Sequence, residues 1–307
     1  MEFREPVPTI IEEQRSADGS LKLLWQLADA RTVESIYFTF QDQVYTCISS
    51  QVGCNVGCPF CATGQQRVLR NLASAEIVAQ VEGSEERVRA AGGTWPLNQV
   101  ALAGMGEPLL NFDAVVQAAT LLRAKGLASV VSLSTSGIVP RMLELAEMAD
   151  DAINKLFISL HATTDGARAL LVPTNRKYPL SQVLAAARIY AKKTETKVTA
   201  TYLLFAGLND TDGDLYRLLD LLDPTLFVVQ LSEWNPVQGV QQPLMPSPRL
   251  DSFQQTLERQ GLEAFIQRSK GREIEGGCGQ LRSRILAGIP GALPTIPASS
   301  VARRAPL

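Results

Sequence analysis

Three cysteines stand close together in the segment CNVGCPFC, at Cys54, Cys58 and Cys61. A structural zinc site usually has four protein ligands, and an ordinary 4Fe–4S cluster is held by four cysteines. No fourth cysteine follows closely in this sequence. The spacing therefore predicts a 4Fe–4S cluster that is held by three thiolates and keeps one iron open. A zinc knuckle and a chance group of cysteines are the alternatives.

The open iron of such a cluster can chelate the amino and carboxylate groups of S-adenosyl-L-methionine (SAM). The spacing resembles the signature of the radical SAM superfamily, in which an aromatic residue, here Phe60, directly precedes the last cysteine. In that chemistry one electron from the cluster splits SAM into a 5′-deoxyadenosyl radical, while the protein positions both cofactors. The resemblance implies two cofactors, a 4Fe–4S cluster and SAM.

Two further cysteines lie far apart in the sequence. Cys47 precedes the cluster segment by seven residues. Without a role in catalysis it would be a small buried hydrophobic residue, as free cysteines often are. Cys278 lies in EGGCGQL, where the neighbouring glycines would leave a thiol approachable. The basic residues Lys270, Arg272 and Arg282 would favour its thiolate, so Cys278 is a candidate nucleophile.

The composition is that of a globular protein with a sizeable core. The chain has 307 residues, 46% of them hydrophobic, which allows one large α/β domain or two small ones. No run approaches the roughly 18 apolar residues of a membrane span, and the start, MEFREPVPTI, lacks the layout of a signal peptide. We therefore expect a cytoplasmic protein without a membrane partner, whose cysteines are thiols, metal ligands or catalytic groups.

The net charge is −2, whereas domains that bind nucleic acids often carry a basic excess. The charge is uneven, however. From Arg249 to the end, nine Arg and Lys residues stand against five Asp and Glu residues, an excess of four. This excess is either solvated surface charge or a patch that faces the substrate.

Short β-rich runs between residues 20 and 49 predict a small antiparallel ribbon. After the cysteine segment, strand-like and helix-like runs alternate, which predicts a parallel sheet with right-handed crossovers. A helix is expected to begin near Ser74, which can act as its N-cap with Glu76 in the first turn. Strands are expected at 98–103, 129–134, 155–160, 197–204, 225–231 and 262–267. Helices are expected near 111–124, 140–149, 180–193, 211–222 and 247–260.

We interpret this pattern as an α/β fold, a partial (βα)6 TIM-like barrel of the radical SAM type with a small N-terminal antiparallel β extension. The expected division is an extension at residues 1–46, a core domain at 47–285 and a loose C-terminal tail at 286–307. Polar or glycine-rich motifs follow five strands, at the cysteine segment, at GMGEP, at STSG, at HAT and at WNP. In α/β barrels the active site lies at the carboxyl ends of the strands, so these motifs predict one shared site.

Each of these motifs also has a structural interpretation. The glycines of GMGEP would let the backbone approach a ligand, and Glu107 would accept hydrogen bonds from an ammonium group, but glycine-proline turns are common. Ser134 is a ligand candidate or a turn former. His161 is the single histidine of the chain, and we interpret it as a wall of the cofactor pocket rather than a general base. Asn235 either contacts the cofactor or forms an Asn-Pro turn.

Taken together, the motifs resemble those of the RlmN/Cfr type of radical SAM adenine methyltransferase. The motifs that carry the resemblance are CISSQVGCNVGCPFCATGQQ, GMGEPLLN, LSTSGIVP, SLHATT, EWNP and GCGQL. The match runs from about Arg4 to Arg284, and all five cysteines fall on cysteines of the family.

The resemblance implies a role for each matching residue. Cys54, Cys58 and Cys61 would hold the cluster, Cys278 would carry the methyl group, and Cys47 would be its resolving partner. The residues that would bind SAM are Gly106, Glu107, Ser134, Ser159, Leu160, His161 and Asn235.

Carbons 2 and 8 of adenine are electrophilic, so direct methyl transfer from SAM fails. The resemblance implies that one SAM methylates Cys278 and that a radical from a second SAM removes a hydrogen from this methyl group. The methylene radical adds to the ring, Glu34 accepts the ring proton, and Cys47 attacks Cys278, which frees the product and leaves a transient disulfide. Carbon 2 is the expected target and carbon 8 the alternative. A surface carboxylate at a strand edge is the alternative for Glu34.

The family usually begins with a small helical domain that helps to hold RNA, and from the start of this chain we expect that domain to be missing. The favoured substrate is rRNA or tRNA, with salt-dependent contacts from Arg67, Arg70, Arg176, Lys177 and the basic C-terminal region. The alternatives are the same chemistry on a small molecule or peptide, and a non-methylating iron–sulfur protein. A one-electron donor such as flavodoxin or ferredoxin is the other expected partner, and we expect a monomer.

Overall fold

The structure, a computed structural model, describes residues 7–40, 43–92, 99–148, 152–234, 236–237, 244–268, 271, 274, 280 and 282–283. Its centre is a ten-stranded sheet in the order β1-β2-β3-β4-β7-β8-β9-β10-β11-β12. The first four strands form an antiparallel meander: β1 (Thr9–Arg15), β2 (Leu21–Gln26), β3 (Thr32–Phe40) and β4 (Gln43–Cys47). From β4 onward every neighbouring pair is parallel.

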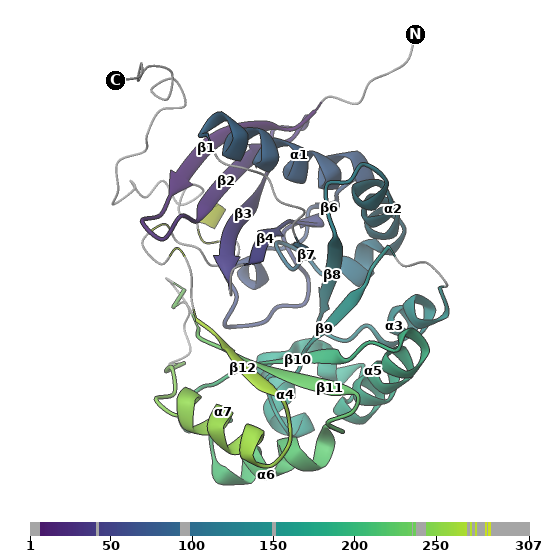
Figure 1. Cartoon of the computed structure of the whole chain (residues 1–307), viewed down its shortest axis with the longest axis vertical. Coiled ribbons are helices and arrows are strands. Elements are labelled where there is room, and N and C mark those ends of the chain that lie inside the picture. Colours follow the sequence, from purple (N-terminus) through teal and green to yellow (C-terminus); the bar gives the residue numbers. More distant parts are fainter. Residues whose placement is uncertain are drawn as a thin grey trace.

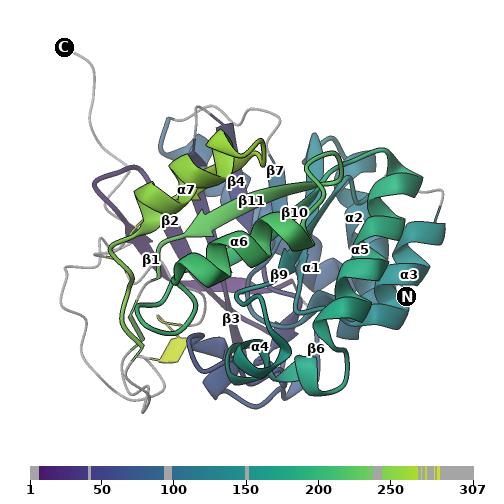
Figure 2. The same ribbon diagram turned by 90° about the horizontal axis from the view of Figure 1, so that it is seen from below.

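The parallel strands and the helices between them make the partial barrel that the sequence predicted. The strands after β4 are β7 (Gln99–Leu102), β8 (Val130–Thr135), β9 (Lys155–Ser159), β10 (Val198–Leu203), β11 (Phe227–Ser232) and β12 (Ala264–Gln267). The helices are α1 (Ser74–Ala90), α2 (Phe112–Ala124), α3 (Val139–Glu147), α4 (Asp165–Leu171), α5 (Leu180–Thr194), α6 (Asp212–Leu221) and α7 (Leu250–Arg259). Figure 1 shows the helices along the outer side of the curved sheet, and Figure 2 shows α6 and α7 across β10 and β11.

The alternation of side chains along the parallel strands separates an apolar outer face beneath the helices from an inner face that lines a cavity with both polar and aromatic side chains. In β9, Leu156 and Ile158 are fully buried in the core beneath the helices. Lys155 and Phe157, which alternate with them, line an internal cavity. The same alternation in β10 points Thr199 and other polar residues inward. The sheet is therefore held by apolar packing on its outer face and leaves its inner face available for a polar ligand.

The six expected parallel strands and the six expected helices after the cysteine segment, including the one near Ser74, are present close to their expected positions. Strand β1, helix α4 and the short pair β5 (Gln51–Val52) and β6 (Arg70–Asn71) were not expected. The N-cap prediction at Ser74 was wrong, because Ala73 is the N-cap residue and Ser74 is already helical. The Glu76 carboxylate accepts a hydrogen bond of 2.9 Å from the Ala73 N–H, so the first turn is capped from inside the helix.

Three 3₁₀ turns complete the described elements: η1 (Thr63–Gln65), η2 (Pro108–Asn111) and η3 (Pro173–Arg176). Across the described ranges, none of the helices combines the length and the apolar character that crossing a membrane requires.

Candidate cofactor and substrate site

The three clustered cysteines lie in the loop between β5 and η1, just beyond the carboxyl end of β4. All three are free thiols. Burial raises the pKa of Cys54 to about 12 and raises the pKa values of Cys58 and Cys61, and the charges of neighbouring sulfurs raise the first two further. A cationic metal centre bound by these sulfurs would reverse this effect, because it favours the thiolate form.

Hydrogen-bond donors of the loop already point at the sulfurs. The backbone N–H of Val56 donates to Cys54, while the N–H groups of Gly64 and Thr63 and the Thr63 hydroxyl donate to Cys61. Donors to ligating sulfur stabilise thiolates and tune an iron–sulfur cluster. Within the described ranges no three His, Cys, Asp or Glu side chains converge on a single metal ion. A 4Fe–4S cluster does not require such convergence, because each cysteine ligates a different iron, and the three-thiol donor set fits it.

The surroundings of the cysteine loop are apolar and aromatic. A cluster of buried residues packs against the loop, and it comprises Val56, Leu171, Val172, Phe205 and Trp234. The indole N–H of Trp234 donates to the Phe60 carbonyl at 2.9 Å, and the Phe60 ring meets the His161 imidazole edge-on at 5.0 Å between centroids. These contacts keep water from one side of the loop, as an oxygen-sensitive cluster with a low potential requires.

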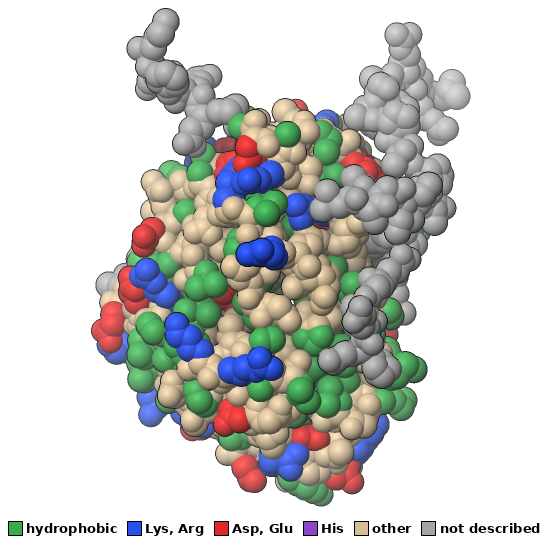
Figure 3. Space-filling model, turned by 180° about the vertical axis from the view of Figure 1, so that it is seen from behind, with side chains coloured by type: hydrophobic (Ala, Val, Ile, Leu, Met, Phe, Trp, Pro, Cys, Tyr) green, Lys and Arg blue, Asp and Glu red, His purple; other side chains and the backbone are tan. Residues whose placement is uncertain are grey.

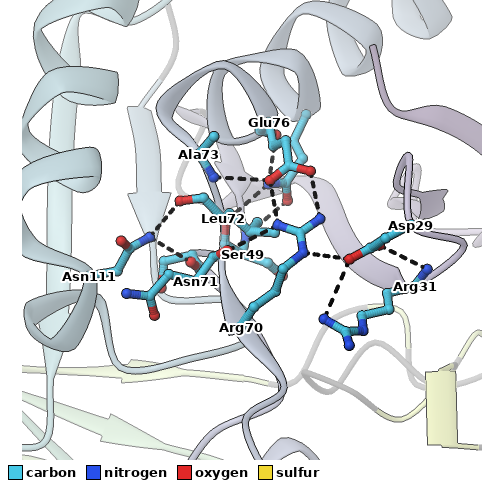
Figure 4. A network of polar contacts seen from close by, with 11 residues as sticks. Asp29, Arg31, Ser49, Arg70, Asn71, Leu72, Ala73, Glu76 and Asn111 are labelled. Carbon is cyan, nitrogen blue, oxygen red and sulfur yellow. Dashed lines mark hydrogen bonds and ion pairs between the residues drawn. The ribbon is translucent and has the colours of Figure 1, made fainter. Parts of the chain in front are cut away.

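A polar network fixes the chain on both sides of the cysteine loop (Figure 4). The Asn111 side chain donates to the carbonyls of Ser50 and Leu72 at 2.9 and 2.8 Å. The Arg70 guanidinium donates twice to Glu76 at 2.7 Å and once to Asp29 at 2.6 Å. Because two carboxylates already neutralise Arg70, its contacts hold the fold, and it is a weaker candidate for phosphate binding than the sequence suggested.

The GMGEP loop follows β7 and packs directly on the chain that leads to the cysteines. Gly106 has a φ of +106°, and a Cβ atom there would lie 2.7 Å from the Gln51 Cβ. Only glycine permits this approach. The Glu107 carboxylate accepts hydrogen bonds from the Thr135 hydroxyl at 2.8 Å and the Ser136 N–H at 2.7 Å. Burial raises the pKa of Glu107, and these hydrogen bonds oppose the shift.

The loops after β8 and β9 supply the other predicted SAM residues. Ser134 is half-buried near the end of β8 and lines the internal cavity. Ser159 ends β9, and Leu160 is fully buried. His161 has a left-handed backbone with a φ of +53°, and its Nδ1 accepts the Leu203 N–H at 3.0 Å.

Burial lowers the pKa of His161 to about 3, and the nearby charge of Arg168 lowers it as well. The imidazole is therefore neutral, with its hydrogen on Nε2 because Nδ1 is the acceptor. A neutral, weakly basic imidazole that packs on Phe60 supports the prediction of a pocket wall rather than a general base.

The internal cavity has a volume of about 790 Å³ and is lined by residues from β2, β3, β4 and the parallel strands. Glu34 and Cys47 both line it. The Glu34 carboxylate forms a buried ion pair with Lys22, with 2.9 Å between Oε2 and Nζ. Cys47 is half-buried, and burial raises the pKa of its thiol from an ordinary 9.0 to about 12. The surface-carboxylate alternative for Glu34 was therefore wrong, because Glu34 is 3% exposed.

Two predicted site residues, Asn235 and Cys278, lie outside the described residues. Their described neighbours make contacts that bear on the site. The Gln280 side chain donates to the Pro236 carbonyl at 3.0 Å, and the backbone N–H of Arg282 donates to the Glu34 carboxylate. Gln66, in the cysteine loop, donates to the Ser283 hydroxyl at 2.6 Å.

The sequence analysis missed three residues that the structure brings to this site. Lys22 pairs with Glu34, Arg168 is fully buried behind the loops after β8 and β9, and the Ser136 hydroxyl is buried without a hydrogen bond of ordinary geometry. One signal was available for Lys22, because a lysine inside the apolar run LKLLW is unusual in a strand with a buried face. For the other two no comparable signal exists in the sequence.

Basic side chains are dispersed on the face that Figure 3 shows. Lys and Arg residues alternate there with acidic and apolar side chains and do not merge into one continuous patch among the described residues of that face. Contacts with RNA would therefore depend on particular residues and on shape more than on a broad positive surface.

Comparisons with known proteins agree with this geometry. Residues 48–219 match the family model described as Radical SAM superfamily. A protein of Thermotoga maritima named "Probable dual-specificity RNA methyltransferase RlmN" is 41% identical over 270 residues, which are 86% of this chain and 76% of that protein. The "Dual-specificity RNA methyltransferase RlmN" of an Anaeromyxobacter species is 39% identical over 276 residues, covering 88% of this chain and 72% of that one. A solved structure of a radical SAM methyltransferase from Sphaerobacter thermophilus has a TM-score of 0.83 at 37% identity and covers 90% of this chain and 81% of that chain.

Proposed function

Because the chain belongs to the radical SAM superfamily and, within it, to the RlmN family of RNA methyltransferases, we propose that it methylates carbon 2 of an adenine in rRNA or tRNA. The methyl group passes through a cysteine of the protein. The observation that carries the proposal is the lining of one cavity by Glu34 and Cys47, with the cysteine loop and the GMGEP loop beyond the same ends of the strands.

Members of the superfamily use a 4Fe–4S cluster and SAM, and these are the cofactors of this chain. When bound, they supply the radical chemistry that activates an otherwise inert methyl group. Cys54, Cys58 and Cys61 would hold the cluster beside the buried apolar and aromatic residues that pack against their loop. Glu107 would accept from the ammonium group of SAM, because its carboxylate has four acceptor positions and the described contacts use three.

The loops after β8, β9 and β11 would complete the SAM site. Ser134 and His161 line the cavity, and His161 packs on Phe60. Ser159 and Leu160 lead the chain to His161 and would complete the segment that receives SAM. Gly106 would let the backbone approach the cofactor. Asn235, whose neighbour Trp234 contacts the cysteine loop, would contact the adenosyl part.

Cys278 would carry the methyl group. Gln280, two residues after Cys278 in the sequence, donates a hydrogen bond to the Pro236 carbonyl in the loop after β11. The contact of Arg282 with Glu34 ties the other side of the same segment to β3. Residues 280 and 282, which follow Cys278 in the sequence, thus contact the loop after β11 and the cavity residue Glu34, and these contacts support the proposed role.

Glu34 would accept the proton that leaves the adenine ring, and the unpaired electron of the adduct would pass to the cluster, so that a closed-shell thioether remains. Lys22 would hold the Glu34 carboxylate toward the cavity. Cys47 would then attack the Cys278 sulfur. The S–S bond forms as the bond between the Cys278 sulfur and the product methylene breaks, and the methylene carbon takes a proton. Because its pKa is about 12, the Cys47 thiol is protonated before this step. A protonated thiol is a poor nucleophile, which disfavours an early disulfide with Cys278.

A labelling experiment tests this function. Anaerobically reconstituted protein is given RNA, a one-electron reductant and SAM with a trideuterated methyl group, and the RNA nucleosides are analysed by mass spectrometry. Passage through a cysteine-bound methyl group removes one deuterium and returns one solvent proton, so 2-methyladenosine should carry two deuteriums. A methyl group with three deuteriums would indicate direct transfer and contradict the proposal.

Two variants serve as controls. Cys278→Ala should still cleave SAM reductively but transfer no methyl group. Cys47→Ala should accumulate RNA covalently bound to protein, because the adduct cannot be released. RNA that stays unmodified while SAM is cleaved by the unaltered protein would favour a small molecule or a peptide as substrate. In the cell we propose flavodoxin or ferredoxin as the electron donor and a monomeric enzyme.

A further inference from the structure

Arg168, in α4, is a large charged side chain with no exposed surface. Its guanidinium makes four hydrogen bonds, all to neutral oxygens. Nε donates to the Leu160 carbonyl at 3.1 Å, and Nη2 donates to the carbonyls of Ser136 and Ser159 at 2.8 and 2.9 Å. Nη1 donates to the Asn175 side chain at 2.9 Å. The planar fork thus joins the loop after β8 to the loop after β9.

The Arg168 charge has no carboxylate in contact with it anywhere in the described ranges. The acidic residue Asp165 is linked to Arg168 through Asn175, whose amide donates to the Asp165 carboxylate at 2.9 Å. Burying a cation without an ionic partner is costly, so such a charge is usually retained because an anion is present.

The Arg168 guanidinium remains charged despite its burial. Burial lowers the pKa of Arg168 to about 10, which is still well above neutrality, and the negative charge of an ionised Cys58 opposes that decrease. Leu171 and Val172, which follow Arg168 in the sequence, belong to the buried cluster against which Cys54 and Cys58 pack, so this charge is buried close to the loop of the predicted cluster ligands.

The peptide that Arg168 holds is also incomplete without a ligand. Ser136 donates its N–H to Glu107, and its carbonyl accepts from Arg168 and from the Thr174 hydroxyl. Its own hydroxyl is buried beside the Glu107 carboxylate, which it stabilises, but makes no hydrogen bond of ordinary geometry. Buried hydroxyls normally have a partner, and an exception beside a carboxylate in a cofactor loop indicates a group that is supplied by a ligand.

We propose that Arg168 is a positioning residue of the cofactor site: its buried charge is the counterion of the cluster on the Cys58 side, and its fork fixes the two loops that receive SAM. The inference rests on the proposed function, because it takes the three cysteines as cluster ligands. It adds Ser136, through its hydroxyl, to the groups that contact SAM.

Two consequences separate the charge of Arg168 from its geometry. A nearby cation stabilises the reduced, more negative cluster, so removal of the charge should make the cluster harder to reduce. A lysine would keep the charge, but one ammonium group cannot reproduce the planar fork that reaches carbonyls of two loops. Lysine should therefore preserve the potential and weaken the binding of SAM.

The test uses the anaerobically reconstituted holoenzyme and no RNA. The cluster potential is measured by redox titration with electron paramagnetic resonance, and SAM affinity by the change that SAM causes in that spectrum. Arg168→Gln should lower the reduced fraction at a fixed potential about tenfold, which corresponds to a shift of about −59 mV for one electron. Arg168→Lys should keep the potential and bind SAM about tenfold more weakly.

Arg217→Gln is the matched control, because Arg217 is a partly exposed arginine that contacts Thr163 and Asp214 near the same loop. It should change neither quantity. An Arg168→Gln protein with full iron content and the unaltered potential would overturn the proposal. If Arg168→Gln does not load a cluster, Arg168→Lys decides, and unaltered SAM affinity would overturn the proposal. Loss of the native fold in both variants would assign Arg168 to folding alone and also overturn it.

These outcomes are distinct from a failure of the proposed function. If the unaltered protein holds no 4Fe–4S cluster, the proposed function fails before any variant is compared. If it holds the cluster and binds SAM but leaves RNA unmodified, the role of Arg168 can still be measured, because neither readout involves RNA.

Discussion

The substitution Lys22→Met should strongly destabilise the protein. Lys22 and Glu34 are diagonal neighbours on β2 and β3, with side chains that are 1% and 3% exposed and 2.9 Å between the charged atoms. At that distance two unit charges attract by about 6 kcal/mol in an effective dielectric of about 20. Desolvation offsets much of this attraction in the pair. Removal of one partner instead leaves a buried charge alone, which costs about 3–5 kcal/mol of the free energy of unfolding.

The assay is urea unfolding of the cluster-loaded protein under anaerobic conditions, followed by circular dichroism. Lys125→Met is the control, because the Lys125–Glu82 pair is exposed and should contribute no more than about 1 kcal/mol. The double variant Lys22→Met with Glu34→Leu should be more stable than the sum of the single effects by about 2 kcal/mol. The reasoning is refuted if Lys22→Met costs no more than Lys125→Met, or if the two single effects simply add.

Three further predictions concern the site. Cys47 in the cluster-loaded protein should react with iodoacetamide at pH 8 about a thousandfold more slowly than an ordinary thiol, because its pKa is about 12 instead of 9.0. Peptide mapping by mass spectrometry gives the rate of this reaction. An ordinary rate would contradict the burial of this thiol. Burial lowers the pKa of His161 from 6.5 to about 3, so the unfolded chain binds a proton that the folded protein does not, and stability is lost as the pH falls through this window. Acidification to pH 5 should lower the free energy of unfolding by about 2 kcal/mol through this residue, at 1.36 kcal/mol per pH unit below 6.5. His161→Gln should remove that part of the pH dependence of the urea midpoint. An unchanged dependence would show that His161 is not buried as a neutral group. Gly106→Ala should weaken SAM binding at least about tenfold, because its Cβ would meet Gln51 and its φ is +106°. Gly166→Ala, with open space around the new Cβ, should leave SAM binding unchanged in the same titration, and equal effects of the two would argue against a special backbone at Gly106.

The sequence predicted the barrel because its signals are local. Each parallel strand is a short apolar run, and each polar motif stands directly after one, so the alternation alone places the motifs at one end of the sheet. The three cysteines needed no fold to be recognised, since their spacing within one loop already limits the possible metal centres. The loops that bring Glu107 to Thr135 and Phe60 to His161 follow from that arrangement.

The remaining features depend on contacts between distant segments. Lys22 meets Glu34 only because of the register of β2 on β3, which a pattern of residues does not determine. Arg168 lies in a helix of seven residues, too short to give a clear periodicity, and its burial depends on where three carbonyls converge. Ser74 illustrates a local limit: a serine before a helix predicts a cap, yet here the carboxylate of Glu76 binds the Ala73 N–H instead.

The central claim is that the cluster and the cysteine thiols serve methylation of an adenine carbon in RNA. The most direct test compares the modified nucleosides of rRNA and tRNA by mass spectrometry in cells that lack the gene and in cells that regain it. We predict that 2-methyladenosine disappears on deletion, returns with the unaltered chain and stays absent with Cys278→Ala. The same nucleoside profile with and without the gene would contradict the account.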